Sequence, residues 1–287
     1  MTVATRLKSK VKTFDYGILF IVLFLMFMAV IMALPLIFLI STAFKPLSEL
    51  FIYPPTFLVR NPTPSNFVAL TSSVSASMVP FSRYALNSVI ITASVVFLVV
   101  MLCSLAAYPL ARHTFPGKNF FFGLIIASLM FAPEVLEIPK FIVISNLNII
   151  NTYLAVIIPQ LAFPLGLFLL KQFMEQIPNA IFEAAYIDGA GEFKLFTQIA
   201  LPQVRPAWAT VAILVFIQAW GDASSGLLIQ NETLKPLTYF LSTVGGQGVA
   251  MAGAAAAASL VSVAPPILIF VFFQRKVVST MAYSGIK

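Results

Sequence analysis

The sequence has few of the residues on which soluble proteins and metal sites depend. Charged residues make up only 9% of the 287 residues, against about 25% in a typical soluble domain, whereas hydrophobic residues make up 60%. There is one cysteine, Cys103, and one histidine, His113, so this chain alone cannot form a disulfide or a zinc site of Cys and His ligands. The composition therefore excludes a water-soluble globule and predicts no metal centre.

Long uncharged runs are the main feature of the chain. About 20 helical residues are needed to cross roughly 30 Å of hydrocarbon. The runs predict an all-α integral membrane protein whose transmembrane domain, residues 16–274, contains six helices, between a 1–15 N-terminus and a 275–287 C-terminus. We place the spans at about 16–44, 84–111, 119–139, 152–170, 206–230 and 249–273. The fourth span should bend at Pro159 and Pro164, because proline interrupts helical hydrogen bonding.

The basic residues predict the orientation. With the N-terminus inside, twelve of the seventeen Lys and Arg residues fall in inner segments, and the outer segments hold only Lys45, Arg60, Arg83, Lys140 and Lys235. Inner loops of membrane proteins are enriched in Lys and Arg, so both termini are expected to be cytoplasmic. The net charge of +7 therefore indicates orientation, and no nucleic-acid partner is predicted.

The inner loop 171–205 carries four of the ten acidic residues and a helical pattern. Asn179 can cap a new helix, and Gly189 with Gly191 allows the chain to reverse after it. The intervening apolar residues share one helix face, and they are Phe182, Ala185, Tyr186 and Gly189. The pattern predicts a short helix-turn-helix under the membrane. A helix pair that merely lies against the lipid headgroups fits the same periodicity.

This loop resembles the EAA signature of permease subunits of binding-protein-dependent ABC importers. The spacing matches at every position of the signature, which is Glu183-Ala184-Ala185, Gly189, Ile199 and Leu201-Pro202. Other segments resemble the carbohydrate-uptake branch of that family: Asn87-Ser88, Ala106-Ala107-Tyr108 with Arg112, Ile138-Pro139, Ile177-Pro178 and the C-terminal segment 280–287. The chain departs from the family at Trp220-Gly221-Asp222, where relatives often have Trp-Asn.

The resemblance implies a fold, a function and partners. The fold would be that of a type I ABC importer permease, a multi-pass protein of the bacterial cytoplasmic membrane. It would import a sugar or oligosaccharide delivered by an extracytoplasmic binding protein, together with a second homologous permease subunit in a heterodimer. Two separate ATPase subunits would bind ATP, so this chain would be no enzyme and would hold no cofactor. In agreement, Gly117-Lys118 lacks the other residues of a phosphate-binding loop.

The resemblance also assigns coupling residues to the loop. The helix that carries the EAA residues would sit in a groove of the ATPase, a helix-in-groove mode of recognition. Its contacts to the ATPase would come from Phe182, Glu183, Ala184, Ala185, Tyr186, Asp188 and Gly189.

The fifth predicted span holds candidate residues for the solute pathway. Asp222 is the only acid inside the predicted fifth span, and intramembrane acids usually face a partner or water. Gln218 and Trp220 can hydrogen-bond to and stack on a sugar. Because residues i and i+4 share a helix face, Gln218 and Asp222 can point the same way while Trp220 points elsewhere. Alternatively, Asp222 ends the helix at the outer headgroups and Trp220 is an interfacial anchor.

Two other function classes fit a membrane protein of this size. A self-sufficient secondary carrier for a small neutral solute would need an ion-coupling site and broken helices in matching halves, but the sequence has no internal repeat. A membrane-embedded enzyme would need acids, histidines or basic residues clustered at one membrane face. Glu134 and Glu137 resemble a catalytic carboxylate pair only by residue type, so no catalytic residue is predicted.

Overall fold

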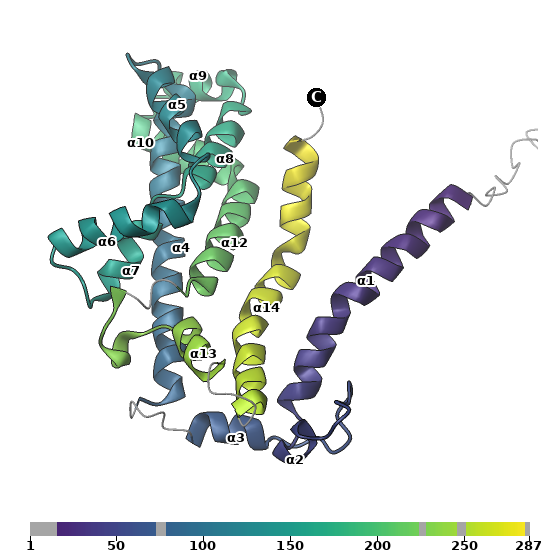
Figure 1. Ribbon diagram of the computed structural model, residues 1–287. Coiled ribbons are helices and arrows are strands. Elements are labelled where there is room, and N and C mark those ends of the chain that lie inside the picture. Colours follow the sequence, from purple (N-terminus) through teal and green to yellow (C-terminus); the bar gives the residue numbers. More distant parts are fainter. Residues whose placement is uncertain (1–15, 73–78, 224–227, 246–250, 285–287) are drawn as a thin grey trace, which may run out of the picture.

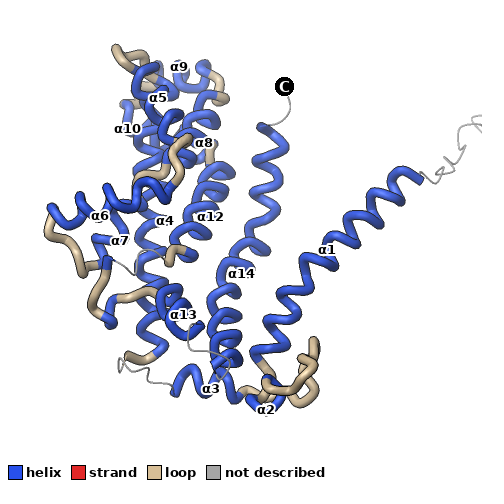
Figure 2. Tube along the Cα trace, viewed as in Figure 1, coloured by secondary structure: helices blue, strands red, loops and turns tan. Residues whose placement is uncertain are grey.

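The computed structural model describes residues 16–72, 79–223, 228–245 and 251–284, and in this part of the chain helices are joined by loops without a strand (Figures 1 and 2). Three helices are long and apolar enough to cross a membrane: α1 (Tyr16–Ala43), α4 (Phe81–Arg112) and α14 (Ala252–Ser284), the last over Ala252–Gln274. Three bent helix pairs raise this number to six if each pair is one span.

Each bent pair breaks where the sequence interrupts the helix. Helix α5 (Lys118–Ser128) is followed, after a bend of 104°, by η1 (Pro133–Leu136) and α6 (Glu137–Asn146). The pair α7 (Tyr153–Gln160) and α8 (Pro164–Glu175) bends by 44°. The third pair bends by 76°. Its first part is the segment of α10 (Glu192–Lys194), η2 (Leu195–Ala200) and α11 (Leu201–Gln203), and its second part is α12 (Arg205–Gly221).

Two helices with a break between them occupy the predicted span 119–139. Helix α5 ends at Ser128, whose hydroxyl donates to the carbonyl oxygen of Ile125 at 2.7 Å. Proline disfavours helical conformation in the residue before it, and Ala132, before Pro133, is extended. The chain therefore turns before η1 and α6 begin. Likewise, α12 ends at Gly221, well before the predicted limit of residue 230.

Helix α4 lies at the centre of the molecule and packs against α8 and α12, while α12 also packs against α14. The largest core cluster includes Val95, Val99 and Ala107 of α4, together with Leu170 of α8 and Val211 of α12, all nearly inaccessible to solvent. These contacts fix α8 and α12, and with them both ends of the inner loop, relative to α4.

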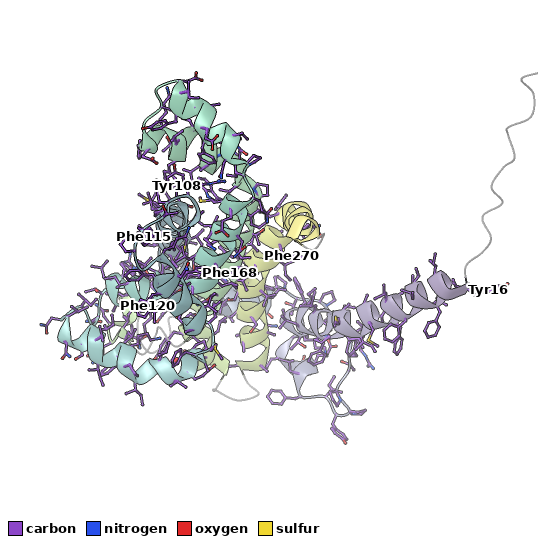
Figure 3. All side chains as sticks on the ribbon, turned by 90° about the horizontal axis from the view of Figure 1, so that it is seen from above. Tyr16, Tyr108, Phe115, Phe120, Phe168 and Phe270 are labelled. Carbon is purple, nitrogen blue, oxygen red and sulfur yellow. The ribbon has the colours of Figure 1, made fainter. Side chains whose placement is uncertain are left out.

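The two ends of the molecule carry different short elements. Helix α9 (Asn179–Ile187) lies at one end, and α2 (Leu47–Leu50), α3 (Ser65–Ser72) and α13 (Leu237–Gly245) lie at the other (Figure 1). Helix α1 packs against α14 near the second end and then extends away from the other helices (Figures 1 and 3). Most of its apolar side chains are exposed, as expected for a surface that faces lipid or another membrane protein.

Candidate functional site

The EAA residues lie on α9, a nine-residue helix that ends in a well-defined reversal. The amide N–H of Gly189 donates to the carbonyl oxygen of Tyr186, and that of Ala190 donates to the carbonyl oxygen of Ala185, both at 3.0 Å. Gly189 has a φ of 81°, which glycine adopts without steric cost. These are the two hydrogen bonds of a Schellman motif, which ends the helix and turns the chain back towards α10.

Asn179 has a different role from the predicted helix cap. Helix α9 begins at Asn179, its N-cap residue is Pro178, and no side chain caps it. The side-chain oxygen of Asn179 instead accepts a hydrogen bond from Nη1 of Arg112 at 2.7 Å. The proline ends the preceding segment because it cannot donate a backbone hydrogen bond. The asparagine ties the new helix to α4.

The predicted coupling residues lie on two different faces of α9. Phe182 and Ala185 pack against the core cluster around α4. Tyr186 is 70% exposed, and its neighbour Ile187, which sequence reasoning did not select, is 85% exposed. The other four predicted residues are exposed as well, namely Glu183, Ala184, Asp188 and Gly189. A partner protein would therefore meet the Tyr186 and Ile187 end of the helix, while Phe182 seats the helix on its own chain.

The predicted pathway residues also separate. Gln218 is exposed, and it lies on a different face of α12 from Trp220, which is buried. The indole Nε1 of Trp220 donates to the carbonyl oxygen of Ser262 at 2.8 Å, and the ring stacks on Phe216. Asp222 directly follows α12, in an extended conformation, and its Oδ2 accepts a hydrogen bond from Nε2 of Gln160 at 3.2 Å. The structure thus brings Asp222 to the break between α7 and α8.

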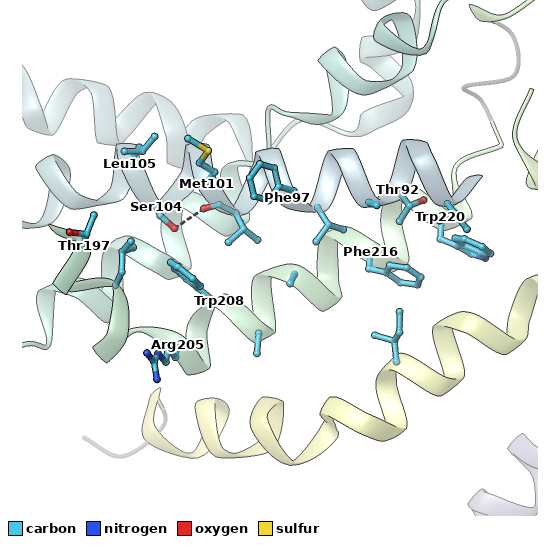
Figure 4. A pocket seen from close by; sticks show the side chains of 18 of the residues that line it. Thr92, Phe97, Met101, Ser104, Leu105, Thr197, Arg205, Trp208, Phe216 and Trp220 are labelled. Carbon is cyan, nitrogen blue, oxygen red and sulfur yellow. Dashed lines mark hydrogen bonds between the residues drawn. The ribbon is translucent and has the colours of Figure 1, made fainter. Parts of the chain in front are cut away.

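A groove of about 1170 Å³ runs between α4, α12 and α14 (Figure 4). Its lining is almost entirely apolar and includes the aromatic side chains of Trp208, Phe216 and Trp220. Neither Gln218 nor Asp222 belongs to that lining. Of the three pathway candidates, the indole faces this groove, and the amide and the carboxylate lie elsewhere.

A buried polar network that was not predicted from the sequence lies at the opposite end of α4 from α9. Asn87 is completely buried, its Nδ2 donates to the carbonyl oxygens of Thr233 and Lys235 at 2.9 Å, and its Oδ1 accepts from the hydroxyl of Tyr153 at 2.7 Å. The hydroxyl oxygen of Ser88 accepts from the amide of Leu237 at 2.7 Å. An asparagine within a long apolar helix is the signal that points to such a network. Within the described residues, no three His, Cys, Asp or Glu side chains form a group that could hold a metal.

Comparisons with known proteins identify the family. The family model described as "Binding-protein-dependent transport system inner membrane component" matches residues 2–283. The arabinooligosaccharides transport system permease protein AraQ of Halalkalibacterium halodurans is 31% identical over 273 residues, which cover 91% of this chain and 93% of that protein. The chain therefore belongs to this family of inner membrane components.

Two solved structures share the fold. One is a bacterial ABC transporter that imports the acidic polysaccharide alginate, with a TM-score of 0.77 at 21% identity over 91% of this chain and 95% of that one. The other is the bacterial alginate ABC transporter in complex with an alginate pentasaccharide-bound periplasmic protein, with a TM-score of 0.60 at 16% identity over 88% of this chain and 92% of that one. The expected all-helical type I importer permease fold is thereby confirmed.

Proposed function

We propose that this chain is the permease subunit of an ATP-driven ABC importer for a sugar or oligosaccharide, coupled to a separate ATPase through the loop 171–205. The single observation that carries the proposal is the construction of α9. A short helix with an exposed apolar end stands at one end of the molecule, on a segment held between α8 and α12, and it carries the EAA spacing. An exposed apolar helix end on a fixed support suits helix-in-groove recognition.

The coupling surface in this proposal is the exposed side of α9. Tyr186 and Ile187 supply apolar anchors, and Glu183 and Asp188 add negative charge beside them. Ala184 and Gly189 are small, so the partner can approach the helix backbone closely. Phe182 and Ala185 contribute from the other face by seating the helix on its own chain. ATP is bound by two ATPase subunits, and this chain performs no chemistry of its own and holds no cofactor.

The importer needs further partners. The alginate transporter that shares this fold forms a complex with a sugar-bound periplasmic protein, and this supports an extracytoplasmic binding protein for the present chain as well. A second, homologous permease subunit would cover the exposed apolar surfaces and complete the pathway. The assembly would lie in a bacterial cytoplasmic membrane, with both termini of this chain inside.

The cargo in this proposal is a neutral sugar or oligosaccharide. The similarity to an arabinooligosaccharide permease supports a saccharide. Gln218 and Asp222 offer hydrogen-bonding groups, whereas the indole N–H of Trp220 is already bonded to Ser262. Gln218→Ala and Asp222→Asn should lower sugar uptake and sugar-stimulated ATP hydrolysis while the complex still assembles, and Trp220→Phe should have a smaller effect. Unchanged uptake in both polar variants would assign the pathway to the partner permease.

Purification of the tagged chain from its native membrane tests the function itself. A second permease and an ATPase should copurify, and their ATP hydrolysis should increase with a binding protein loaded with the right saccharide from a panel of mono- and oligosaccharides. A chain that purifies alone and transports a solute without ATP would be a secondary carrier, and the proposal would then be wrong.

A further inference from the structure

The inner end of α4 contacts both arms of the loop that carries α9. The entry arm runs from the end of α8 through Pro178 into α9, and the exit arm runs through α10 and η2 to α12. Two side chains of α4, Tyr108 and Arg112, make these contacts. They are four residues apart, one helical turn, and so lie on the same face of the helix.

Arg112 contacts four groups of the entry arm. Its Nη2 donates to the carbonyl oxygen of Ile177 at 2.6 Å and also to that of Met174, while Nη1 donates to the side-chain oxygen of Asn179 at 2.7 Å. The guanidinium carbon lies 4.2 Å from the centre of the Phe182 ring. The carbonyls at the end of a helix lack partners within it and carry partial negative charge, so a cation is favourable there. A planar guanidinium can donate in several directions and stack on an aromatic ring at once, which a lysine cannot.

Tyr108 binds the exit arm. Its hydroxyl donates to Oε2 of Glu192 in α10 at 3.1 Å, and its ring centre lies 5.3 Å from that of Phe196 in η2. The same ring is 6.5 Å from the ring of Phe182 in α9. Tyr108 itself is only 7% exposed, whereas the Glu192 side chain that accepts its hydrogen bond is largely exposed. Oε2 of Glu192 also lies 3.4 Å from Nε2 of His113, the residue that follows α4.

These contacts matter because apolar burial holds α9 only weakly. No residue of α9 is fully buried; Phe182 and Ala185 reach the core cluster but remain partly exposed. The contacts of Arg112 with Asn179 and Phe182 therefore add to the few apolar contacts that connect α9 to the body. By contrast, α4 itself is fixed along its length by fully buried residues such as Val95, Val99 and Ala107.

We propose that Tyr108 and Arg112 form a clamp by which α4 receives the displacement of α9 when the ATPase moves. This inference rests on the proposed function, since it assumes an ATPase bound to α9. Arg112 and Tyr108 are positioning residues: they act through α9 and touch neither nucleotide nor sugar. Loosening the clamp lets α9 follow the ATPase while α4 stays in place, so ATP is hydrolysed without transport.

The first test measures sugar molecules transported per ATP hydrolysed, in the full complex reconstituted with its binding protein. Arg112→Gln should lower this ratio by about tenfold or more, because each hydrogen bond lost from a charged donor changes an equilibrium by about that factor. Arg112→Lys should restore only part of it. The matched control is Arg205→Gln, which removes an exposed positive charge from the same inner loop and should leave the ratio unchanged.

Asn179 provides a milder pair of variants that keeps the test valid if Arg112→Gln does not assemble. Asn179 is exposed, so its replacement should not prevent folding. Asn179→Leu removes one acceptor of Arg112 and should lower the transport ratio, whereas Asn179→Asp converts that bond to an ion pair and should keep the ratio at least at its original level. Equal ratios in the two variants, or an unchanged ratio in Arg112→Gln, would overturn the clamp.

A distance measurement separates the clamp from a purely structural role. Spin labels at Ala180 on α9 and Leu102 on α4, both exposed and outside the proposed coupling surface, would be placed in a Cys103→Ser chain within the complex. The distance between the labels should stay the same with and without bound ATP, and it should shift or broaden on ATP binding in Arg112→Gln. An ATP-dependent shift in the chain with Arg112 intact would show that α9 moves independently of α4. Failure of the proposed function would differ from both results, because no ATPase would then copurify with the unaltered chain.

Discussion

At the scale of single residues, the polar side chains buried in this apolar protein hold segments that are distant in the sequence. Asn87 joins α4 to the segment 233–235 and to Tyr153 of α7 with all of its hydrogen-bonding atoms engaged. Asn87 is completely buried, so each group left unpaired there costs free energy. Such residues therefore fix how a loop lies against a helix where apolar packing alone does not.

We predict that Asn87→Ala destabilises the purified complex by at least about 3 kcal/mol, because two backbone carbonyls and the hydroxyl of Tyr153 lose their partner at about 1–3 kcal/mol each. Thermal unfolding monitored by tryptophan fluorescence measures the effect. The control is Ser94→Ala, at a half-buried position two turns further along α4, which should change the unfolding temperature little. A similar unfolding temperature for both variants would contradict this role of Asn87.

Glu49 organises the segment that follows α2, outside the predicted spans. Oε1 accepts from the hydroxyl of Thr56 at 3.2 Å and from the amide of Arg60 at 2.9 Å, and Oε2 accepts from the amide of Asn61 at 3.4 Å. Burial alone would raise the pKa of Glu49, but these donors and the nearby positive charge of Lys45 together lower it below its ordinary value of 4.5. Because the folded pKa is the lower one, this stabilisation is present above pH 4.5 and is lost as the pH falls through the folded pKa.

We therefore predict that Glu49→Gln at neutral pH has the effect of acid on the unaltered chain. Hydrogen exchange of the peptide that contains Arg60 and Asn61 should be faster in the variant at pH 7, and the two proteins should converge well below pH 4.5 after correction for intrinsic exchange rates. Glu134→Gln, at an exposed glutamate, serves as the control and should leave this peptide unchanged. Equal protection of the peptide in Glu49→Gln and in the unaltered chain at pH 7 would count against the role of Glu49.

At the scale of elements, α9 has an inner face that rests on α4 and an outer end that is free for a partner. The sequence predicts the helix, its start after Pro178 and its reversal at Gly189, because these features depend on local residues. It does not predict which residues face outward. Phe182 and Tyr186 belong to one apolar stripe by periodicity, yet only the position of α4 determines that Phe182 faces inward and that Ile187 is among the most exposed residues.

The same distinction explains the α5 to α6 region. Composition shows an apolar run ending near Glu134 and Glu137, and from this we predicted one span. The 104° bend between Lys118–Ser128 and Pro133–Asn146 depends on how these helices pack, which is a tertiary property. Proline marks the break at residue 133 but does not fix its angle.

A charged residue at the outer end of α9 should prevent binding of the ATPase without affecting the folding of the permease. Ile187→Asp places a carboxylate at the most exposed large apolar residue of α9, so the chain should insert normally but lose the copurifying ATPase. Ala185→Asp, on the inner face, should displace α9 and change the distance between labels on α9 and α4 as well. The control is Phe115→Asp, on the neighbouring inner loop, which should retain the ATPase. If Ile187→Asp also retains it, the ATPase binds another surface.

At the scale of the whole molecule, the arrangement of the helices separates two ends. Helix α4 has 32 residues and is about 48 Å long at 1.5 Å per residue, so it extends beyond the roughly 30 Å of the hydrocarbon layer. One of its ends meets the loop with α9, and the other meets the segment 232–237 through Tyr84, Asn87 and Ser88. One helix therefore contacts both surface regions directly, which suits a protein that must link events on the two sides of a membrane.

The excess of basic residues in the predicted inner segments predicts the orientation of these two ends. Single cysteines at Ser65 in α3, Ser242 in α13 and Gln198 in η2, all exposed positions, would be introduced into a Cys103→Ser chain. An impermeant maleimide should label Ser65→Cys and Ser242→Cys in intact cells, because α3 and α13 lie at the end opposite α9 (Figure 1). It should label Gln198→Cys only after the membrane is permeabilised. Labelling of Gln198→Cys from outside would reverse the orientation, place α9 on the side without ATP, and remove the basis for both the coupling loop and the clamp.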